Sequence, residues 1–413
     1  MKIWLIKEGE PLPCDKNPRL MRTGILAEYL INAGHDVIWW SSTFNHGEKK
    51  YRFNQRTTLP LYKKGCLVLL HSNTDYKKNT SLRRIIYHKN LAHDFLAACM
   101  MYDVPDIILC SYPTCDFAEV AICYGEKHNI PVVLDIRDLW PDIFERALPR
   151  ILCRFSKLIL KPLSRRANIV MKKATAIIAI NESHLQWALK RASREMRNTD
   201  AVFGLSYVKY VMTDIDRNAQ IDYWETLGIN SNTWNICFMG TLSLATLDME
   251  TVISGFETLS KSHTDMRLII CGNGDGYANY TNLSRSNHNI VLPGWQSGSQ
   301  IASLMEMGNV GLYPYKNMRN FENSLTNKMV EYMSSGLPVL TGLEGYAKKY
   351  IEENEVGLHY TCGDVKSFIS AVETMYYNNM QTEKMKKKAQ IAYERDFIAD
   401  KVNQGIEELI TRI

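Results

Sequence analysis

Two apolar runs that both end in glycine decide the fold: they are WNICFMG at 234–240 and MRLIICG at 266–272. Three more runs follow, at 289–295, 310–315 and 338–342, and the intervals between them have helical periodicity. The runs are continuous rather than alternating, which is typical of strands covered by helices on both faces. Strands and helices that alternate in this way predict a doubly wound parallel sheet.

The first half of the chain has the same organisation, with apolar runs at 2–6, 36–40, 66–70, 106–111, 131–137 and 176–180. Residues 196–233 interrupt it because they are polar, turn-rich and poor in periodicity. We therefore predict an α/β protein with two Rossmann-like domains that face a cleft. The first spans 1–198, the second spans 199–396, and a C-terminal helix at 397–413 crosses back to the first domain.

The composition is that of a globular protein, with 413 residues, 46% of them hydrophobic and 23% charged. The formal net charge of +5 is too small to indicate a nucleic-acid partner. Ten cysteines are scattered and several lie inside apolar runs, which indicates reduced thiols of a cytosolic protein. No spacing suggests a metal site, and we expect neither a signal peptide nor a membrane span.

Glycine-rich turns follow the first two runs of the second domain. Gly240, Thr241 and Ser243 follow the first run, and Gly272 and Gly274 follow the second. Glycine lets backbone N–H groups approach a phosphate, and a hydroxyl adds a hydrogen bond. Tight turns with no ligand would explain either one alone. Two at consecutive strand ends favour a phosphate-bearing ligand.

A polar segment then leads into a helix whose first N–H groups and positive dipole end suit an anion. It contains Asn323, Ser324, Asn327, Lys328 and Glu331. Lys328 and Glu331 are three residues apart and so share one helix face. An ammonium suits a diphosphate and a carboxylate suits ribose hydroxyls, although a surface salt bridge is the simpler alternative.

Trp295 comes directly after the third strand run of this domain, in the sequence Pro293-Gly294-Trp295. We leave two interpretations open. It is either a core anchor or a ring that closes over a ligand.

The block NKMVEYMSSGLPV at 327–339 resembles the nucleotide-sugar-binding block of GT-B glycosyltransferases of the retaining family 4 type. The glycine turns and Pro293-Gly294-Trp295 are similar to that family too, and LDMETVI at 247–253 resembles its bacterial surface-polysaccharide subgroup. The resemblance implies that the donor-binding residues are Gly240, Thr241, Ser243, Gly272, Gly274, Trp295, Asn323, Ser324, Asn327, Lys328 and Glu331. It also implies that no metal or other cofactor is needed.

Two departures from the family pattern concern the same site. The family usually has a second Glu eight residues before Glu331, where this chain has Asn323. Many members also carry Arg and Lys after the first strand of the domain, where this chain reads GTLSLATL at 240–247. The polysaccharide subgroup shares both departures, so we interpret a variant site rather than an inactive one.

In the first domain, LDIRDLWPD at 134–142 resembles the Arg-Asp-Leu-Trp-Pro signature of the same subgroup. A carboxylate at a strand end can bind sugar hydroxyls or take a proton from an attacking hydroxyl. We choose Asp138 for this role, with Asp135 as a buried structural residue and Asp142 as a helix cap. A purely structural pair of Arg137 with Asp138 is the alternative.

Arg19 and Arg22 lie in the loop after the first strand, one helical turn apart. They would grip a phosphate of acceptor or donor, together with Arg137 and Asp138, or would be solvated charges at a helix start. We weigh these two interpretations equally.

A stretch from Arg146 to Asn181 contains nine Lys or Arg and no Asp or Glu. Five cations recur at helical spacing beside apolar residues: Arg150, Arg154, Lys157, Lys161 and Arg165. A solvated charged face is the commonest cause of such a stripe, but solvated faces usually mix signs. Charge of one sign with an apolar flank favours an anionic membrane surface.

The resemblance implies a cytoplasmic enzyme, peripheral on the inner face of the plasma membrane, that transfers a sugar with retention. The donor would be a nucleotide-sugar, specifically a UDP-sugar. The acceptor would be a polyprenyl-diphosphate-linked saccharide of O-antigen, capsule, lipopolysaccharide or exopolysaccharide synthesis. Glu331 and Asp138 would be the catalytic residues. The alternatives are a nucleotide-sugar epimerase of the same fold and a catalytically silent GT-B partner protein at the membrane.

Overall fold

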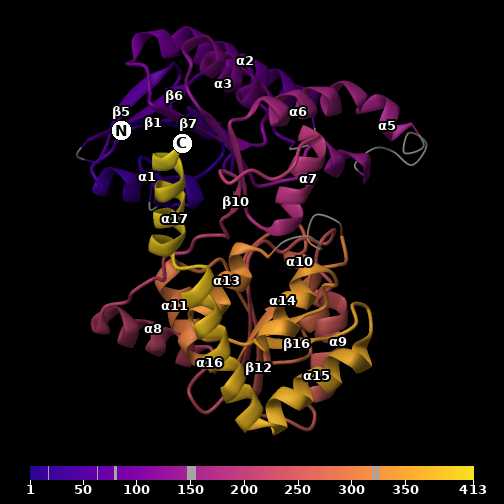
Figure 1. The fold of residues 1–413 in the computed structure, drawn as a ribbon. Coiled ribbons are helices and arrows are strands. Elements are labelled where there is room, and N and C mark those ends of the chain that lie inside the picture. The colour runs from indigo at the N-terminus through magenta and orange to yellow at the C-terminus, as the bar shows by residue number, and fades with distance from the viewer. Residues whose placement is uncertain (17, 63, 79–80, 147–154, 319–320, 322–324) are drawn as a thin grey trace. The chain divides into compact units, whose positions relative to one another are not determined.

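The computed structural model describes residues 1–413 except 17, 63, 79–80, 147–154, 319–320 and 322–324 (Figure 1). The chain divides into two compact units. The first comprises Met1–Ser206 with Ala399–Ile413, and the second comprises Tyr207–Ile398. Each unit contains a sheet of parallel strands with helices, as predicted, and the first sheet has one antiparallel edge strand.

The sheet of the first unit has the strand order β10-β9-β8-β7-β1-β2-β6-β5. Every pair of neighbours is parallel except β5 with β6. The strands are β1 (Lys2–Ile6), β2 (Asp36–Ser42), β5 (Thr57–Leu61), β6 (Gly65–Leu70), β7 (Ile107–Tyr112), β8 (Val132–Ile136), β9 (Ala176–Ala179) and β10 (Ala201–Val202). A separate small hairpin pairs β3 (Phe44–Asn45) with β4 (Lys50–Tyr51).

Helices cover both faces of this sheet, and neighbouring residues of a strand enter different cores because strand side chains alternate. Trp4 and Trp40 lie in one cluster, whereas Ile3 and Trp39 lie in the other. The helices are α1 (Arg22–Asn32), α2 (Leu82–Ala98), α3 (Cys115–His128), α5 (Ser156–Ile159), α6 (Lys161–Lys173), α7 (Glu182–Ala192) and α17 (Ala399–Arg412), with short turns η1 (Cys99–Met101) and η2 (Asp142–Arg146).

The last helix of the chain, α17, packs on the first unit beside α1. Its Glu407 accepts hydrogen bonds from Tyr29 at 3.0 Å and interacts with His35 at 2.9 Å. Its apolar face enters the core through Ile406 and Ile410. The C-terminal helix predicted at 397–413 is thus α17, which spans Ala399–Arg412 and belongs to the first unit.

The sheet of the second unit has the order β13-β12-β11-β14-β15-β16, and its strands are all parallel. The strands are β11 (Trp234–Met239), β12 (Met266–Cys271), β13 (Ile290–Gly294), β14 (Val310–Tyr313), β15 (Val339–Thr341) and β16 (Gly357–His359). The helices described are α8 (Asp214–Thr226), α9 (Met249–Leu259), α10 (Tyr277–Ser284), α11 (Gly298–Met307), α13 (Asn327–Ser334), α14 (Tyr346–Asn354), α15 (Val365–Tyr377) and α16 (Asn379–Asp396).

Helix α8 lies in the segment that the sequence pattern had indicated to be without periodic structure. Thr213 caps its N-terminus by accepting the N–H of Asp216, and Asp214 and Asp216 favour the positive end of the helix dipole. Only Trp224 of this helix is buried. One buried residue gives no apolar stripe, so the helix has no visible period in the sequence.

Each sheet has a switch point, where the chain's successive strands begin to be added on the other side of the first strand. This point lies between β1 and β7 in the first unit and between β11 and β14 in the second. Ligands of doubly wound sheets bind outside the carboxyl ends of the strands at such points. The residues that follow β1, β7, β11 and β14 are therefore the first places to look for a site.

Candidate functional site

In the second unit, the side chain of Lys328 lies directly on the glycine that ends β11. A Cβ atom at Gly240 would lie 2.1 Å from Lys328 Cε and 2.2 Å from its Nζ. Gly240 also has φ +145°, which side chains rarely adopt. Only glycine therefore allows the ammonium of α13 to reach the end of the central strand.

Aromatic residues flank the same ammonium. Lys328 Nζ donates to the hydroxyl of Tyr315, lies 5.1 Å from the centroid of that ring and 5.5 Å from the centroid of the Phe238 ring. Tyr315 follows β14 and Phe238 belongs to β11, so the cation lies at the switch point of the sheet. Sequence reasoning missed both rings, because Phe238 reads as an ordinary core residue and Tyr315 as the end of an apolar run.

The glycine turns of the second sheet have a structural role, because they let neighbouring strand ends approach and hydrogen-bond one another. A Cβ at Gly272 would lie 1.8 Å from the carbonyl oxygen of Gly240, and one at Gly274 would lie 2.1 Å from that of Leu242. The N–H of Gly240 donates to Cys271 at 2.9 Å and that of Gly272 donates to Gly294 at 2.7 Å. These two N–H groups are therefore engaged in hydrogen bonds at the sheet edge, and the part of Gly240 and Gly272 in donor binding stays a prediction.

Other predicted donor residues lie around this edge. Thr241 is exposed and Ser243 is half-buried. Asn327 is exposed as the first residue of α13. Asn323 and Ser324 lie outside the described residues.

Glu331 is buried inside this unit. Its side chain is 5% exposed, and its Oε1 accepts a hydrogen bond of 3.2 Å from the hydroxyl of Tyr207. Burial of a carboxylate is costly unless it is hydrogen-bonded or paired, so this contact fixes its orientation. The alternative of a surface salt bridge is therefore wrong for Glu331. Tyr207 was missed because it lies 124 residues away in the sequence.

Trp295 is 71% exposed. It follows Gly294, the last residue of β13, at the same edge of the sheet as the other glycine turns. The alternative of a core anchor is therefore wrong, and an indole at this position can contact a planar ring.

In the first unit, two of the predicted phosphate-binding arginines belong to a buried ion-pair network. Arg22 Nε donates to Asp135 Oδ2 at 3.0 Å, and Arg137 Nε donates to the same oxygen at 2.7 Å. Arg137 also donates to Glu10, which in turn accepts from Thr23 at 3.0 Å and 3.1 Å. Burial would raise the pKa of Asp135, but the two guanidiniums hold it below its usual value.

This network fastens β1, α1 and β8 to one another, so it explains the burial of Arg22 without a ligand. Arg137 pairs with Asp135 rather than with Asp138, which corrects the structural alternative considered for that residue. Arg19 is exposed and precedes α1, whereas Arg22 is its first residue and 5% exposed. Arg19 and Arg22 therefore do not form a phosphate-binding pair on one helical turn.

Asp138 lies half-buried in the loop after β8. Burial raises the pKa of its carboxyl group, and opposing effects come from the N–H of Leu139, which donates at 2.8 Å, and from the charges of Lys7 and Arg84. A carboxylate with a raised pKa is a better proton acceptor near neutral pH than an ordinary one. Its role at an acceptor hydroxyl stays a prediction.

Asp142 accepts hydrogen bonds from Trp187 Nε1 at 2.7 Å and from Arg191. It ties η2 to α7, so its predicted role as a cap is replaced by a link between two elements.

A second buried pair at this edge escaped the sequence analysis. Glu8 follows β1, is 6% exposed and lies 3.3 Å from Nε2 of His88, which is 2% exposed. Burial by itself would raise the pKa of Glu8, but the hydrogen bond and charge of His88, together with Lys7, hold it at about 2. The sequence signal was weak because His88 lies in the middle of α2, far along the chain.

The basic stripe is only partly described. Arg150 and Arg154 lie outside the described residues, as does the side chain of Lys157. The remaining part is not one helix, because α5 ends at Ile159 and α6 begins at Lys161 with a proline in its first turn. Lys161 and Arg165 are exposed on α6.

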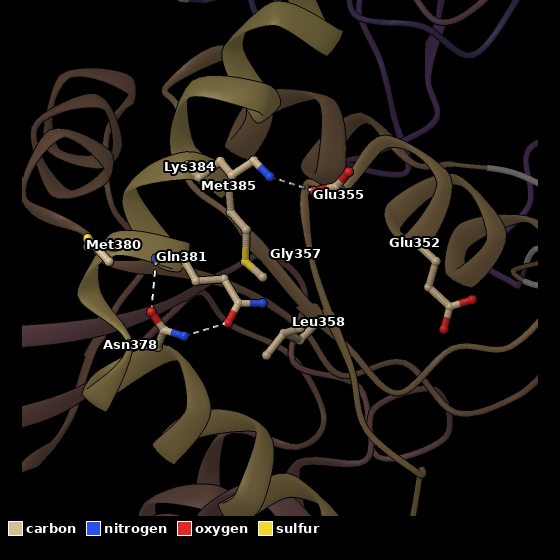
Figure 2. A pocket seen from close by; sticks show the side chains of 9 residues that line it. All are labelled: Glu352, Glu355, Gly357, Leu358, Asn378, Met380, Gln381, Lys384 and Met385. Atoms are coloured by element: carbon tan, nitrogen blue, oxygen red, sulfur yellow. Dashed lines mark hydrogen bonds and ion pairs between the residues drawn. The ribbon is translucent and has the colours of Figure 1, made fainter.

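A cavity of about 580 Å³ lies at the opposite, amino edge of the second sheet (Figure 2). It is bounded by the first residues of β16 and the starts and ends of neighbouring helices, and Lys384 crosses part of it to reach Glu355 at 3.4 Å. Because the ligands of such sheets bind at the carboxyl edge, we do not assign this cavity to the candidate site.

Within the described part of the chain, no three His, Cys, Asp or Glu side chains are grouped so that they could hold a metal ion. None of the described helices is both long enough and apolar enough to cross a membrane.

Comparisons with known proteins agree with this geometry. Residues 222–392, which cover most of the second unit, match the family described as "Glycosyl transferases group 1". A search of curated proteins finds no match.

Three solved structures illustrate the similarity of fold. Sucrose-phosphate synthase from Thermosynechococcus elongatus has a TM-score of 0.74 at 14% identity, over 100% of this chain and 98% of that one. HepE of Anabaena in complex with UDP and glucose has a TM-score of 0.66 at 15% identity, with both chains fully covered. WaaG, a glycosyltransferase involved in lipopolysaccharide biosynthesis, has a TM-score of 0.61 at 12% identity, with both chains fully covered.

The fold is therefore GT-B, with two Rossmann-like parallel sheets and C-terminal helices. The family match covers residues 222–392 of the second unit, and the similarity to the solved structures covers the fold of both units.

Proposed function

We propose that this protein transfers a sugar from a UDP-sugar to a polyprenyl-diphosphate-linked saccharide, with retention of configuration, in the synthesis of a bacterial surface polysaccharide. The observation that carries the proposal is the ammonium of Lys328 on Gly240, at the switch point of a domain that matches group 1 glycosyltransferases. The uracil base is supported by HepE, whose structures contain UDP, UDP and glucose, or UDP-glucose.

In this proposal Lys328 neutralises the diphosphate of the donor. When the bond between the sugar and the β-phosphate breaks, negative charge grows on the departing UDP, and a fixed cation stabilises that charge without reorganisation. Tyr315 and Phe238 hold the ammonium in position. The start of α13 adds the positive end of a helix dipole beside it.

Glu331, oriented by Tyr207, binds hydroxyl groups of the donor, and exposed Trp295 stacks on its base. Asp138 accepts the proton of the acceptor hydroxyl as that oxygen attacks the sugar. Arg22 and Arg137 act as positioning residues, since their charges already serve Asp135 and Glu10.

We further propose that the protein acts peripherally at the inner face of the plasma membrane. Exposed Lys161 and Arg165 contribute to this contact at about 1 kcal/mol each on an anionic surface. A double reversal, Lys161→Glu with Arg165→Glu, is expected to reduce co-flotation with vesicles that contain anionic lipid. Unchanged flotation would contradict this part of the proposal.

The central experiment is transfer of labelled sugar from UDP-glucose, UDP-galactose and the two UDP-N-acetylhexosamines to lipid-linked saccharides extracted from a bacterial membrane. We expect one donor to label the lipid fraction, and Asp138→Asn and Glu331→Gln to abolish that label while the proteins stay folded. Labelling that persists in both variants would contradict the assigned catalytic residues. Absence of labelling with all nucleotide-sugars, despite donor binding, would favour a silent partner protein.

A further inference from the structure

A cavity of about 270 Å³ lies within the first unit, among the N-terminal ends of helices. Its walls come from the first turns of α2, α3 and α6 and from the segment that follows β8. The apolar residues that line it are Leu82, Ile85, Trp140, Pro141, Phe144, Leu160 and Leu163. The volume is near the lower end of the ~300–1,000 Å³ typical of small-molecule sites. It suits a short length of apolar chain.

Large apolar side chains surround this cavity at the surface. Leu82 and Ile85 line it and are 78% and 47% exposed. Helix α5 comes directly before the lining residue Leu160 in the sequence, and its Leu158 is 67% exposed. Single exposed apolar residues are ordinary, but a group of them around one apolar cavity is typical of a surface that meets an apolar partner.

One cation connects this cavity with Asp138. Arg84 lines the cavity, its guanidinium lies 5.1 Å from the ring centroid of Trp140, and its charge acts on the carboxyl of Asp138. Asp138 and Trp140 belong to the same loop, two residues apart. The cavity, the cation and the candidate acceptor carboxylate therefore follow one another along this edge of the unit.

The second cation of the lining has a different environment. Arg166 donates to Glu119 at 2.6 Å and to Asp116 at 2.7 Å, so two carboxylates match its charge. Neither α2 nor α6 has an acidic residue in its first turn. The charge of Arg84 acts on Glu8, and its guanidinium lies 5.1 Å from the ring centroid of Trp140, in the loop of Asp138. The anionic end of an amphiphile with its chain in the cavity would meet this guanidinium next to that loop.

We propose that this cavity holds the first part of the isoprenoid chain of a lipid diphosphate, with the diphosphate at Arg84 and the attached saccharide at Asp138. The inference rests on the proposed function, because it assigns a place to the lipid of the acceptor. The apolar walls bind the isoprenoid chain and the guanidinium binds the diphosphate. Because the cavity, Arg84 and Asp138 follow one another in this order, the saccharide end of the acceptor lies at Asp138.

A matched pair of substitutions tests the cavity. Ile85 and Ile86 are neighbours on α2 with exposed fractions of 47% and 49%, but only Ile85 lines the cavity. We expect Ile85→Asp to weaken binding of a fluorescent farnesyl diphosphate, measured below its critical micelle concentration, by at least tenfold. Ile86→Asp should change it less than twofold. Both residues are exposed, so thermal unfolding should show that both variants fold.

The charged end of the ligand is tested separately with Arg84→Met. This change should weaken farnesyl diphosphate by about tenfold and farnesol hardly at all, while inorganic diphosphate should compete weakly in every variant. If inorganic diphosphate competes as well as farnesyl diphosphate, the site binds an anion only, and the lipid proposal is overturned.

An equal loss of farnesyl diphosphate binding in Ile85→Asp and Ile86→Asp would also overturn the lipid proposal, because it would indicate nonspecific hydrophobic binding to the surface. A monomer-to-dimer change abolished by Ile85→Asp, without farnesyl diphosphate binding, would assign the cavity to a second copy instead.

The proposed function is examined in parallel with an acceptor saccharide on a short, soluble alkyl diphosphate. Transfer to this acceptor that survives in Ile85→Asp, together with unchanged farnesyl diphosphate binding, would reject the cavity and leave the enzyme function standing. Selective loss of farnesyl diphosphate binding in a protein that transfers to no acceptor would keep the cavity and reject the function.

Discussion

The two sheets place charged side chains at the same topological position and use them differently. Beside the switch point of the first sheet, Arg22 and Arg137 are engaged with Asp135 and Glu10 in a buried network. Beside that of the second, Lys328 lies on a glycine, among the hydroxyl and rings of aromatic residues.

The comparison teaches that position in a doubly wound fold does not assign a role to a cation. An arginine engaged with buried carboxylates stabilises the fold, whereas the lysine that lies on the glycine at a strand end, beside two aromatic rings, is placed where ligands of such sheets bind. The same distinction separates Asp135, which is 1% exposed and paired, from half-buried Asp138.

The largest expected effect is on the network of the first unit. Asp135→Asn would leave two buried guanidiniums with one fewer charge partner, and breaking a buried pair costs about 3–5 kcal/mol. Chemical denaturation should show this loss of unfolding free energy. The control is Asp103→Asn, which removes an exposed pair with Lys2 and should cost less than about 1 kcal/mol. Equal costs for the two variants would show that the network is not structural.

The second prediction concerns Lys328 at the switch point of the second sheet. Lys328→Met should lower kcat/KM about 10²- to 10³-fold, because a fixed charge at the leaving group is lost. Its unfolding free energy should change little by comparison with Asp135→Asn. Lys261→Met, which removes an exposed lysine from the loop after α9, serves as the control and should keep its activity. A stable enzyme with normal kcat/KM after Lys328→Met would contradict the functional role assigned to Lys328.

The buried pair of Glu8 and His88 predicts how stability depends on pH. The pKa of Glu8 is about 2 in the folded protein and ordinary in the unfolded chain. Its stabilisation is therefore present above about pH 4.5 and is lost as the pH falls toward 2, with a magnitude on the order of 3 kcal/mol. Denaturation of the wild type and Glu8→Gln across this range should converge at low pH. Parallel curves would contradict the assignment.

The smallest effect concerns Trp295, whose side chain is exposed, whereas Asp135 and Glu8 are buried and Lys328 is half-buried. Stacking on a base contributes about 1–3 kcal/mol in nucleic-acid complexes, so Trp295→Ala should weaken UDP binding by roughly 5- to 150-fold. Trp295→Phe should recover most of the affinity, because it restores an aromatic face. Equal affinity of the alanine and phenylalanine variants would show that the indole does not stack on the donor.

Much of the fold could be predicted because continuous apolar runs mark buried parallel strands. The runs at 2–6, 234–240 and 266–272 correspond to β1, β11 and β12 within one residue. Helix α8 could not be found, because it buries only Trp224. Short edge strands such as β16, with three residues, give no pattern either.

The candidate site could be predicted only where its residues are close in sequence. The spacing of Lys328 and Glu331 placed them on one helix, and the loop after β8 brought Arg137 and Asp138 together. The contacts that decide their roles join distant segments: Arg22 to Asp135 across 113 residues, and Tyr207 to Glu331 across 124. No local pattern encodes such pairs, so the sequence could not tell a phosphate-binding arginine from a buried structural one.

The most direct test of the central claim is calorimetric titration of UDP and of uridine into the wild type and Lys328→Met. If the ammonium on Gly240 holds the diphosphate, the wild type binds UDP much more tightly than uridine, and Lys328→Met binds both alike. If Lys328→Met retains the full preference for UDP, the diphosphate lies elsewhere and the assignment of this site is contradicted.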